Sequence, residues 1–174
     1  MAHDRDIQKS RRVFLWLLFA VYGLFLVYIL FFWSERDGQI EQADFSYYME
    51  ECFNLIPFRT IVKHTMCMVE EGYYMRRWAA RNLFGNLILF YPMGLLLPCL
   101  FRKLRTLRQN IWLSFRLILS VEVVQMLLFL GFFDIDDLIL NMTGWIFGFL
   151  TLSIPLVRRF LVKLCFLREN EVPT

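Results

Sequence analysis

The stretch FFDIDDLILNMTGW, residues 132–145, places acidic and amide side chains at the start of a long apolar segment. Its polar members include Asp134, Asp136, Asp137 and Asn141. A helix that begins at a membrane surface would have this composition, because aspartates stabilise a helix N-terminus. A binding site at the same surface would have it too, and the surrounding sequence bears on both alternatives.

The rest of the chain is apolar as well. Of its 174 residues, 58% are hydrophobic, and its mean hydropathy of +0.48 is well above that of soluble domains. Four segments have the roughly 20 apolar residues that a helix needs to cross a bilayer. They are residues 13–33, 83–101, 111–130 and 138–157. The first is too long for a signal peptide and lacks a cleavage site after it, so we expect a retained anchor.

Charged residues are divided unequally between the two sides of such a protein. The segments 1–12, 102–108 and 158–174 hold twelve Lys or Arg residues against four acids, whereas 34–81 and 131–137 hold six against eleven. Loops rich in Lys and Arg stay in the cytoplasm, so we expect both termini there. Anionic lipid accounts for the basic loops, and we therefore expect no nucleic-acid partner.

The predicted fold is an all-α polytopic membrane protein with four transmembrane helices and an outer interfacial segment between the first and second. Its parts are a cytoplasmic basic tail (1–12), the first helix (13–33), an external loop (34–82), a three-helix core (83–157) and a cytoplasmic basic tail (158–174). Within the loop, EEGYYMRRWAARN (70–82) mixes aromatic and basic residues, which is typical of a helix at headgroup level. An ordinary solvated loop is the alternative. The sequence leaves open whether Cys52 and Cys67 form a disulfide.

Two features of the predicted helices concern their packing. The second helix contains Pro92, Gly94 and Pro98, and proline removes a backbone hydrogen bond and kinks a helix. In lipid the freed carbonyl must find another partner. The fourth helix contains Gly144 and Gly148, a spacing that lets a neighbouring helix approach closely.

Polar residues of three predicted helices fall at the same depth. Asn82 and Asn86 begin the second helix, Glu122 and Gln125 lie toward the end of the third, and Asp137 and Asn141 begin the fourth. At 1.5 Å per residue, Glu122 lies roughly 12 Å below the outer boundary. A carboxyl at such depth costs about 2.5–3.5 kcal/mol or more, so it is expected to face the protein interior or water.

We therefore predict an outward-facing polar pocket that binds a ligand. Its candidate residues are Asn86, Glu122, Gln125, Asp136, Asp137 and Asn141, with Arg59 and Arg81 as candidate cations. A buried hydrogen-bond network that only holds the helices together is the alternative. The acidic lining favours an ammonium group, another hydrogen-bonding group, or a phosphate bridged by a cation.

The sequence indicates metal binding and catalysis less strongly than it indicates a ligand-binding pocket. Asp134, Asp136 and Asp137 are oxygen ligands suited to Mg²⁺ or Ca²⁺, although their spacing matches no calcium loop. We predict no cofactor, with a divalent cation at these aspartates as the alternative. His3 and His64 lack ligand spacing, and the catalytic residues, if any, are unknown: the sequence contains no phosphate-binding loop and no serine elbow.

Four motifs in order resemble the VanZ-like family of integral membrane proteins, which is named for an accessory protein linked to teicoplanin resistance. The motifs are NLIPF (54–58), GNLILFYPMGLLLP (85–98), SVEVVQ (120–125) and DIDDLILNMTG (134–144). The resemblance maps the family's characteristic positions onto Asn54, Pro57, Phe58, Asn86, Pro92, Gly94, Glu122, Gln125, Asp136, Asp137, Asn141 and Gly144. Many relatives have an arginine shortly before the acidic motif, where this chain reads LGFFD (130–134). If that arginine pairs with a carboxylate, another cation must serve here, or the carboxylates stay partly protonated.

The resemblance implies a protein of the bacterial cytoplasmic membrane with a role in the cell envelope or in resistance to teicoplanin-type glycopeptides. We expect the pocket to bind a lipidated glycopeptide or a lipid-linked cell-wall precursor. The alternative is an intramembrane enzyme on a lipid-linked substrate, with Glu122 as general base, although no recognised catalytic signature supports it. A third reading is an assembly partner whose polar groups only fix helix packing, and an oligomer remains open.

Overall fold

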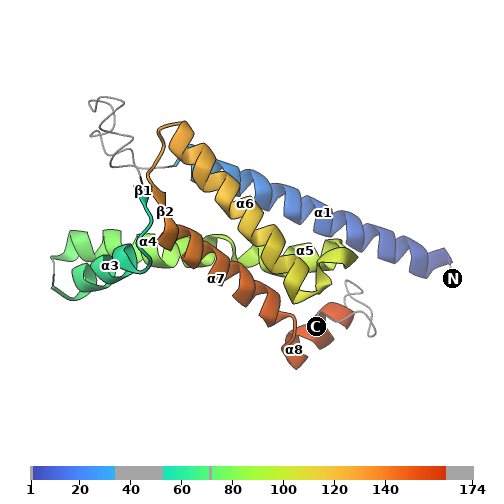
Figure 1. The fold of residues 1–174 in the computed structure, drawn as a ribbon. Helices are drawn as coiled ribbons and strands as arrows, with labels where there is room; N and C mark the ends of the chain where they lie inside the picture. The colour runs from blue at the N-terminus through green and yellow to red at the C-terminus, as the bar shows by residue number, and fades with distance from the viewer. Residues whose placement is uncertain (1, 34–52, 71, 164–174) are drawn as a thin grey trace.

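The computed structural model of the protein describes residues 2–33, 53–70 and 72–163 (Figure 1). Its elements in chain order are α1 (Ala2–Phe31), β1 (Phe53–Asn54), α3 (Arg59–Glu70), α4 (Tyr73–Leu89), α5 (Tyr91–Leu100), the 3₁₀ helix η1 (Arg102–Arg105), α6 (Leu107–Leu127), β2 (Phe133–Asp134), α7 (Ile135–Thr151) and α8 (Pro155–Lys163). Apart from the two short strands, the described elements are helical.

Within the described residues, three stretches of helix are long and apolar enough to cross a membrane. They are Lys9–Phe31 in α1, Tyr73–Leu100 in α4 and α5 together, and Leu107–Leu127 in α6. The pair α7 and α8 makes a fourth if helices bent by 72° are counted as one span. The predicted class, an all-α polytopic membrane protein, is confirmed.

The fourth apolar segment is not one straight helix. α7 ends at Thr151, and α8 begins at Pro155 after a turn. Proline has no N–H to continue a helix but fits the first turn of a new one. The last residues of the predicted span, 155–157, therefore belong to α8, which exposes Leu156 and Phe160.

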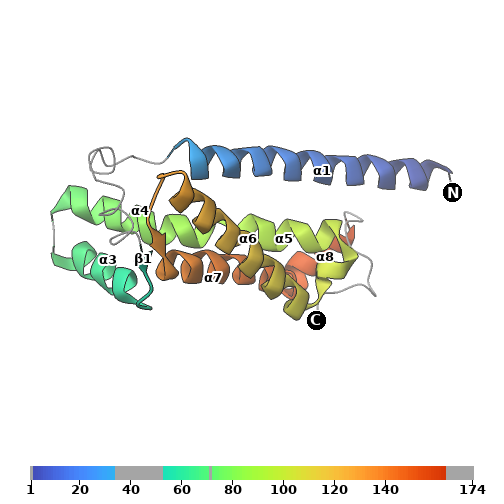
Figure 2. The same ribbon diagram turned by 45° about the horizontal axis from the view of Figure 1, so that its top comes forward.

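The helices are arranged around α7 (Figure 1, Figure 2). α7 packs against α4, α5 and α6, while α1 lies along the outside of the bundle and packs against α5. Much of the surface of α1 is exposed and apolar, for example at Leu17, Val21 and Leu24. In a membrane this surface faces lipid, so its exposure is the expected arrangement for a spanning helix.

Glycines bring α7 into direct contact with the backbone of α4 and α5. A Cβ atom on Gly144 would lie 1.8 Å from the Leu87 carbonyl oxygen, and one on Gly148 would lie 2.0 Å from that of Tyr91. From the opposite side, a Cβ on Gly94 would lie 1.9 Å from the Trp145 carbonyl oxygen. The close approach expected from the glycine spacing of the fourth segment is thus confirmed.

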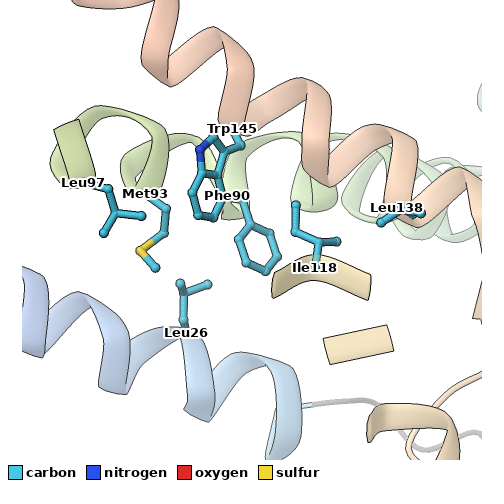
Figure 3. Close-up of a cluster of buried hydrophobic side chains, with 7 residues drawn as sticks. All are labelled: Leu26, Phe90, Met93, Leu97, Ile118, Leu138 and Trp145. Carbon is cyan, nitrogen blue, oxygen red and sulfur yellow. The ribbon is translucent and has the colours of Figure 1, made fainter. Parts of the chain in front are cut away.

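A buried hydrophobic cluster fills the space between α1, α5, α6 and α7 (Figure 3). Its members are Leu26, Phe90, Met93, Leu97, Ile118, Leu138 and Trp145. The rings of Phe90 and Trp145 stack at 6.2 Å between centroids with an interplanar angle of 22°. The Trp145 indole Nε1–H donates to Asn110 Oδ1 at 2.5 Å, and this satisfies the buried indole donor.

The expected kink in the second span is a break at Phe90, which separates α4 from α5. Pro92 stands in the first turn of α5, and the backbone N–H groups of Met93 and Gly94 both bond to the Phe90 carbonyl. The Leu89 carbonyl accepts a hydrogen bond from the Tyr22 hydroxyl of α1. Because the Met93 N–H bonds the Phe90 carbonyl and not that of Leu89, the Leu89 carbonyl is freed at this break, and a side chain of the first helix supplies the partner that it needs in lipid.

Candidate functional site

A cavity of about 320 Å³ lies among α1, α4, α6 and α7. Six of the eight predicted ligand-binding residues line it: Arg81, Asn86, Glu122, Gln125, Asp137 and Asn141. They come from three helices, α4, α6 and α7. The sequence predicted a common depth for all of them except Arg81, which it assigned to the external loop, and it did not show that they converge. The structure brings them together around one space.

The cavity begins where α4 faces the first turn of α7. The Asn86 side-chain amide donates to Asp137 Oδ1, and this bond joins two residues that are 51 positions apart. Asn141 lies one helical turn beyond Asp137 and is buried, with 3% of its surface exposed. The two helices thus present amide and carboxyl groups to the same space.

Glu122 enters the cavity from α6. Its side chain is buried, with 6% of its surface exposed. One turn away, Gln125 donates through Nε2 to the Leu30 carbonyl of α1 at 2.8 Å. Gln125 therefore joins the end of α1 to the cavity wall as well as lining it.

Asp136 is absent from the cavity lining and is completely buried elsewhere. Its carboxylate accepts backbone N–H groups of Phe58 at 2.6 Å, Thr60 at 2.7 Å and Ile61 at 3.0 Å. These amides belong to the start of α3, where N–H groups have no partner within the helix. Phe58 has a left-handed backbone with φ of 67° just before this turn. Asp136 therefore acts as an N-terminal cap for a helix 75–78 residues earlier in the chain.

Asp134 completes this connection. Its carboxylate accepts the Asp136 N–H at 2.8 Å, the Thr60 hydroxyl at 2.5 Å and the Asn54 amide at 3.1 Å. The short strands β1 and β2 pair in parallel at the same place, with Phe53 opposite Phe133. The motifs NLIPF and DIDD are thus parts of one hydrogen-bonded joint, which we call the acidic joint.

The three aspartates do not form the metal site that was the alternative for them. Among the described residues, no group of three His, Cys, Asp or Glu side chains is arranged to hold a metal ion. Asp134 and Asp136 bind N–H and O–H donors of the acidic joint, while Asp137 turns toward Asn86 and the cavity. Their separate partners keep the carboxylates from converging on one point.

The two predicted arginines lie in different places. Arg81 on α4 lines the cavity and takes part in an interaction within the chain. Arg59 is exposed at the start of α3 and is not part of the lining. Leu130, Gly131 and Phe132, which stand where many relatives have an arginine, line the cavity instead. Arg81 is therefore the cationic member of this lining.

The structural roles of three residues were not predicted from the sequence. Asn110 on α6 is buried and bonds both Trp145 and the Leu104 carbonyl, at 2.8 Å for the latter. Its only signal in the sequence is its spacing of four from Ser114, another buried polar residue of α6. The second missed feature is Thr60 in the acidic joint, whose signal is its place directly after NLIPF.

His64 is the third missed feature. It is buried on α3, and its ring lies edge-on against Trp78 of α4, with 4.7 Å between centroids. Burial lowers the pKa of this imidazole below its ordinary value, and nearby Lys63 lowers it further, while Asp134 and Asp136 act in the opposite direction. The neutral ring therefore serves as a packing residue between α3 and α4. The sequence left a disulfide between Cys52 and Cys67 open; Cys67 is a free cysteine in the structure, and Cys52 lies outside the described residues.

Comparison with known proteins agrees with the ordered motifs. The model of the VanZ/LLP1 family matches residues 19–158, which include α4 to α7, the acidic joint and the residues of the cavity. No curated protein and no solved structure matches the chain. Because the family match covers most of the sequence, this membrane protein belongs to the VanZ/LLP1 family.

Proposed function

We propose that this protein binds the polar head of a lipidated or lipid-linked ligand in the cavity between α1, α4, α6 and α7. The observation that carries the proposal is the convergence of Glu122, Asp137 and Asn141 from two helices on one cavity. Intramembrane carboxyls are costly, and they usually mark a binding site or pathway. A cavity with a few convergent polar groups is also the usual form of a small-molecule site.

The proposed setting is the bacterial cytoplasmic membrane, with both termini in the cytoplasm and the acidic joint outside. The distribution of basic residues supports this orientation. The ligand class follows from the family's link to teicoplanin, which is lipidated, and from the geometry of a polar cavity among apolar helices. Either a lipidated glycopeptide or a lipid-linked cell-wall precursor has a polar head and a hydrocarbon part. The proposed role is in the cell envelope or in glycopeptide resistance.

Direct binding tests this function. The full chain in nanodiscs is titrated with a teicoplanin-type lipoglycopeptide and with a polyprenyl-linked cell-wall precursor. We expect one of them to bind and its affinity to fall at least about tenfold in Glu122→Gln and Asp137→Asn. Glu70→Gln, which changes an exposed acid at the end of α3, is the control and should bind as the wild type does. Unchanged affinity in both cavity variants would exclude the cavity as the site.

A second candidate is an intramembrane enzyme, because two carboxyls share the cavity and could act as general acid and base. Its substrate would be a lipid-linked molecule of the cell envelope. Incubation of the same nanodiscs with a labelled polyprenyl-linked substrate, followed by mass spectrometry of the lipid, distinguishes turnover from binding. Product formation that is lost in Glu122→Gln would favour the enzyme, whereas bound but unaltered lipid would favour the binding protein.

A further inference from the structure

Some polar groups of the cavity lining have hydrogen-bond partners within the protein, and others have none. Three amide side chains in the lining each donate to an acceptor of the protein itself. These bonds are Asn82 to the Trp78 carbonyl at 3.1 Å, Asn86 to the Asp137 carboxylate, and Gln125 to the Leu30 carbonyl at 2.8 Å. Three of the four amide side chains of the lining thus direct a donor into the protein.

Acceptors are left over on the same wall. Asn141 Oδ1 is buried and has no hydrogen-bond partner within the described part of the chain. Residues 2–33, 53–70 and 72–163 likewise provide no hydrogen bond to the Glu122 carboxyl, which is also buried. A buried acceptor without a donor, such as Asn141 Oδ1, costs free energy, and this cost is recovered when a donor arrives. The cavity therefore favours a ligand group that donates hydrogen bonds.

The charge of the lining favours the same kind of group. It contains two carboxyls, Glu122 and Asp137, against one guanidinium, that of Arg81, which already takes part in an interaction within the chain. A phosphate presents mainly acceptor oxygens, and it would meet a lining with surplus acceptors. Trp33 and Trp78 also line the cavity, and aromatic rings attract cations through their faces.

From these observations we propose that the ligand group in the cavity is a protonated primary amine carried by an amphiphile. An ammonium has three N–H donors and no acceptor, which matches the unused acceptors of Glu122 and Asn141. The apolar residues Leu30 and Leu89 of the same lining accommodate the adjoining hydrocarbon. This inference rests on the proposed function, since it names the chemistry of the group that the cavity binds.

The experiment compares three probes with one alkyl chain and different heads: dodecylamine, dodecanol and dodecyl phosphate. The full chain is placed in nanodiscs of phosphatidylcholine, which has no primary amine. Bound probe is counted by native mass spectrometry, and apparent affinity is taken from the rise in Tm with probe concentration. We expect the amine to bind at least about tenfold more tightly than the other two.

Two variants and a control locate this binding. Glu122→Gln should weaken amine binding about tenfold or more, and Glu70→Gln should leave it unchanged. Asn141→Leu replaces the unpartnered amide with an apolar side chain of similar size, so it should weaken amine binding without lowering the Tm of the free protein. If Glu122→Gln does not fold, the ranking of the three probes and the Asn141→Leu variant still decide the question.

The outcomes separate this inference from the proposed function. Tighter binding of the alcohol or the phosphate, sensitive to Glu122→Gln, would overturn the amine and leave the binding site in place. Absence of binding by all three probes to the folded protein would overturn both. Addition of phosphatidylethanolamine distinguishes two sources of the amine: weaker probe binding would identify a bilayer lipid as occupant, and unchanged binding would indicate a ligand from outside the bilayer.

Discussion

At the scale of the residue, the acidic motif serves both the fold and the cavity. Asp134 and Asp136 accept N–H and O–H groups of the segment before and at the start of α3, whereas the next residue, Asp137, bonds Asn86 at the cavity. Adjacent positions of a helix point in different directions, since each residue turns about 100° from the last. Two neighbouring aspartates can therefore serve two sites.

The bonds of Asp136 predict a large effect of its charge on stability. In Asp136→Asn, at least one oxygen that accepts a backbone N–H becomes an NH₂ group, so charge-assisted bonds to α3 are lost. Charged hydrogen bonds contribute about 1.5–3 kcal/mol each, and we expect a loss of stability of that order. Thermal unfolding in detergent measures it, with Glu70→Gln as the control. Equal Tm values for the two variants would show that the acidic joint does not stabilise the fold.

His64 predicts a dependence of stability on pH. Burial holds its pKa below the ordinary 6.5, so the unfolded chain takes up the proton first as the pH falls. The contact between α3 and α4 should therefore be most stable above about pH 6.5 and weaken below it. Hydrogen-exchange protection of α3 amides, compared at pH 7.5 and 5.5, should show the loss. The same loss in His64→Gln would assign the effect to another group.

At the scale of the element, the approach of α7 to α4 and α5 depends on glycine. Gly144 faces the Leu87 carbonyl and Gly148 faces that of Tyr91, so the two backbones meet without side chains between them. Close contact of this kind allows weak Cα–H···O bonds between helices. Asp137 and Asn141 precede Gly144 on α7, and Asn86 precedes Leu87 on α4, so the contact at Gly144 also brings Asp137 to Asn86.

Two glycine variants test the contact. A Cβ on Gly144 would collide with rigid backbone 1.8 Å away, whereas Gly85 on α4 has nothing within 4 Å of the equivalent position. We expect Gly144→Ala to destabilise the protein by about 1–3 kcal/mol, or to prevent folding. Gly85→Ala should be neutral or stabilising by up to about 1 kcal/mol, because alanine favours the helix. Yield of monodisperse protein and Tm are the measurements, and equal behaviour of the two variants would contradict the packing.

At the scale of the whole molecule, the charged ends of the bundle oppose each other. The N-terminal end of α1 lies at the same end of the bundle as the C-terminal end of α5 and α8, and the acidic joint lies toward the other end (Figure 1). The first of these ends carries the basic residues of η1 and α8. Their common placement is what the unequal distribution of charge predicts.

Reporter fusions in a bacterial host test the orientation. Green fluorescent protein fused after residue 174 should fluoresce, because both termini are expected in the cytoplasm, and alkaline phosphatase at that point should be inactive. A phosphatase fusion after residue 130 should be active, since that loop is expected outside. Each reporter controls for the other at each site. The reverse pattern would show the opposite orientation in the membrane, with the acidic joint in the cytoplasm.

The sequence by itself determined the class of the protein and its apolar segments, and it predicted a common depth for the polar residues of three helices. Hydropathy, charge distribution and glycine spacing are properties of neighbouring positions, so they can be interpreted without coordinates. The tertiary structure decided which of those residues meet. It placed Arg81 at the cavity and Arg59 away from it, and it showed that Asp136 accepts hydrogen bonds from the start of α3. These outcomes depend on the rotation of each helix and on backbone contacts between helices. The bonds of Asp136, for example, join residues 75–78 positions apart in the chain, and no local pattern encodes them.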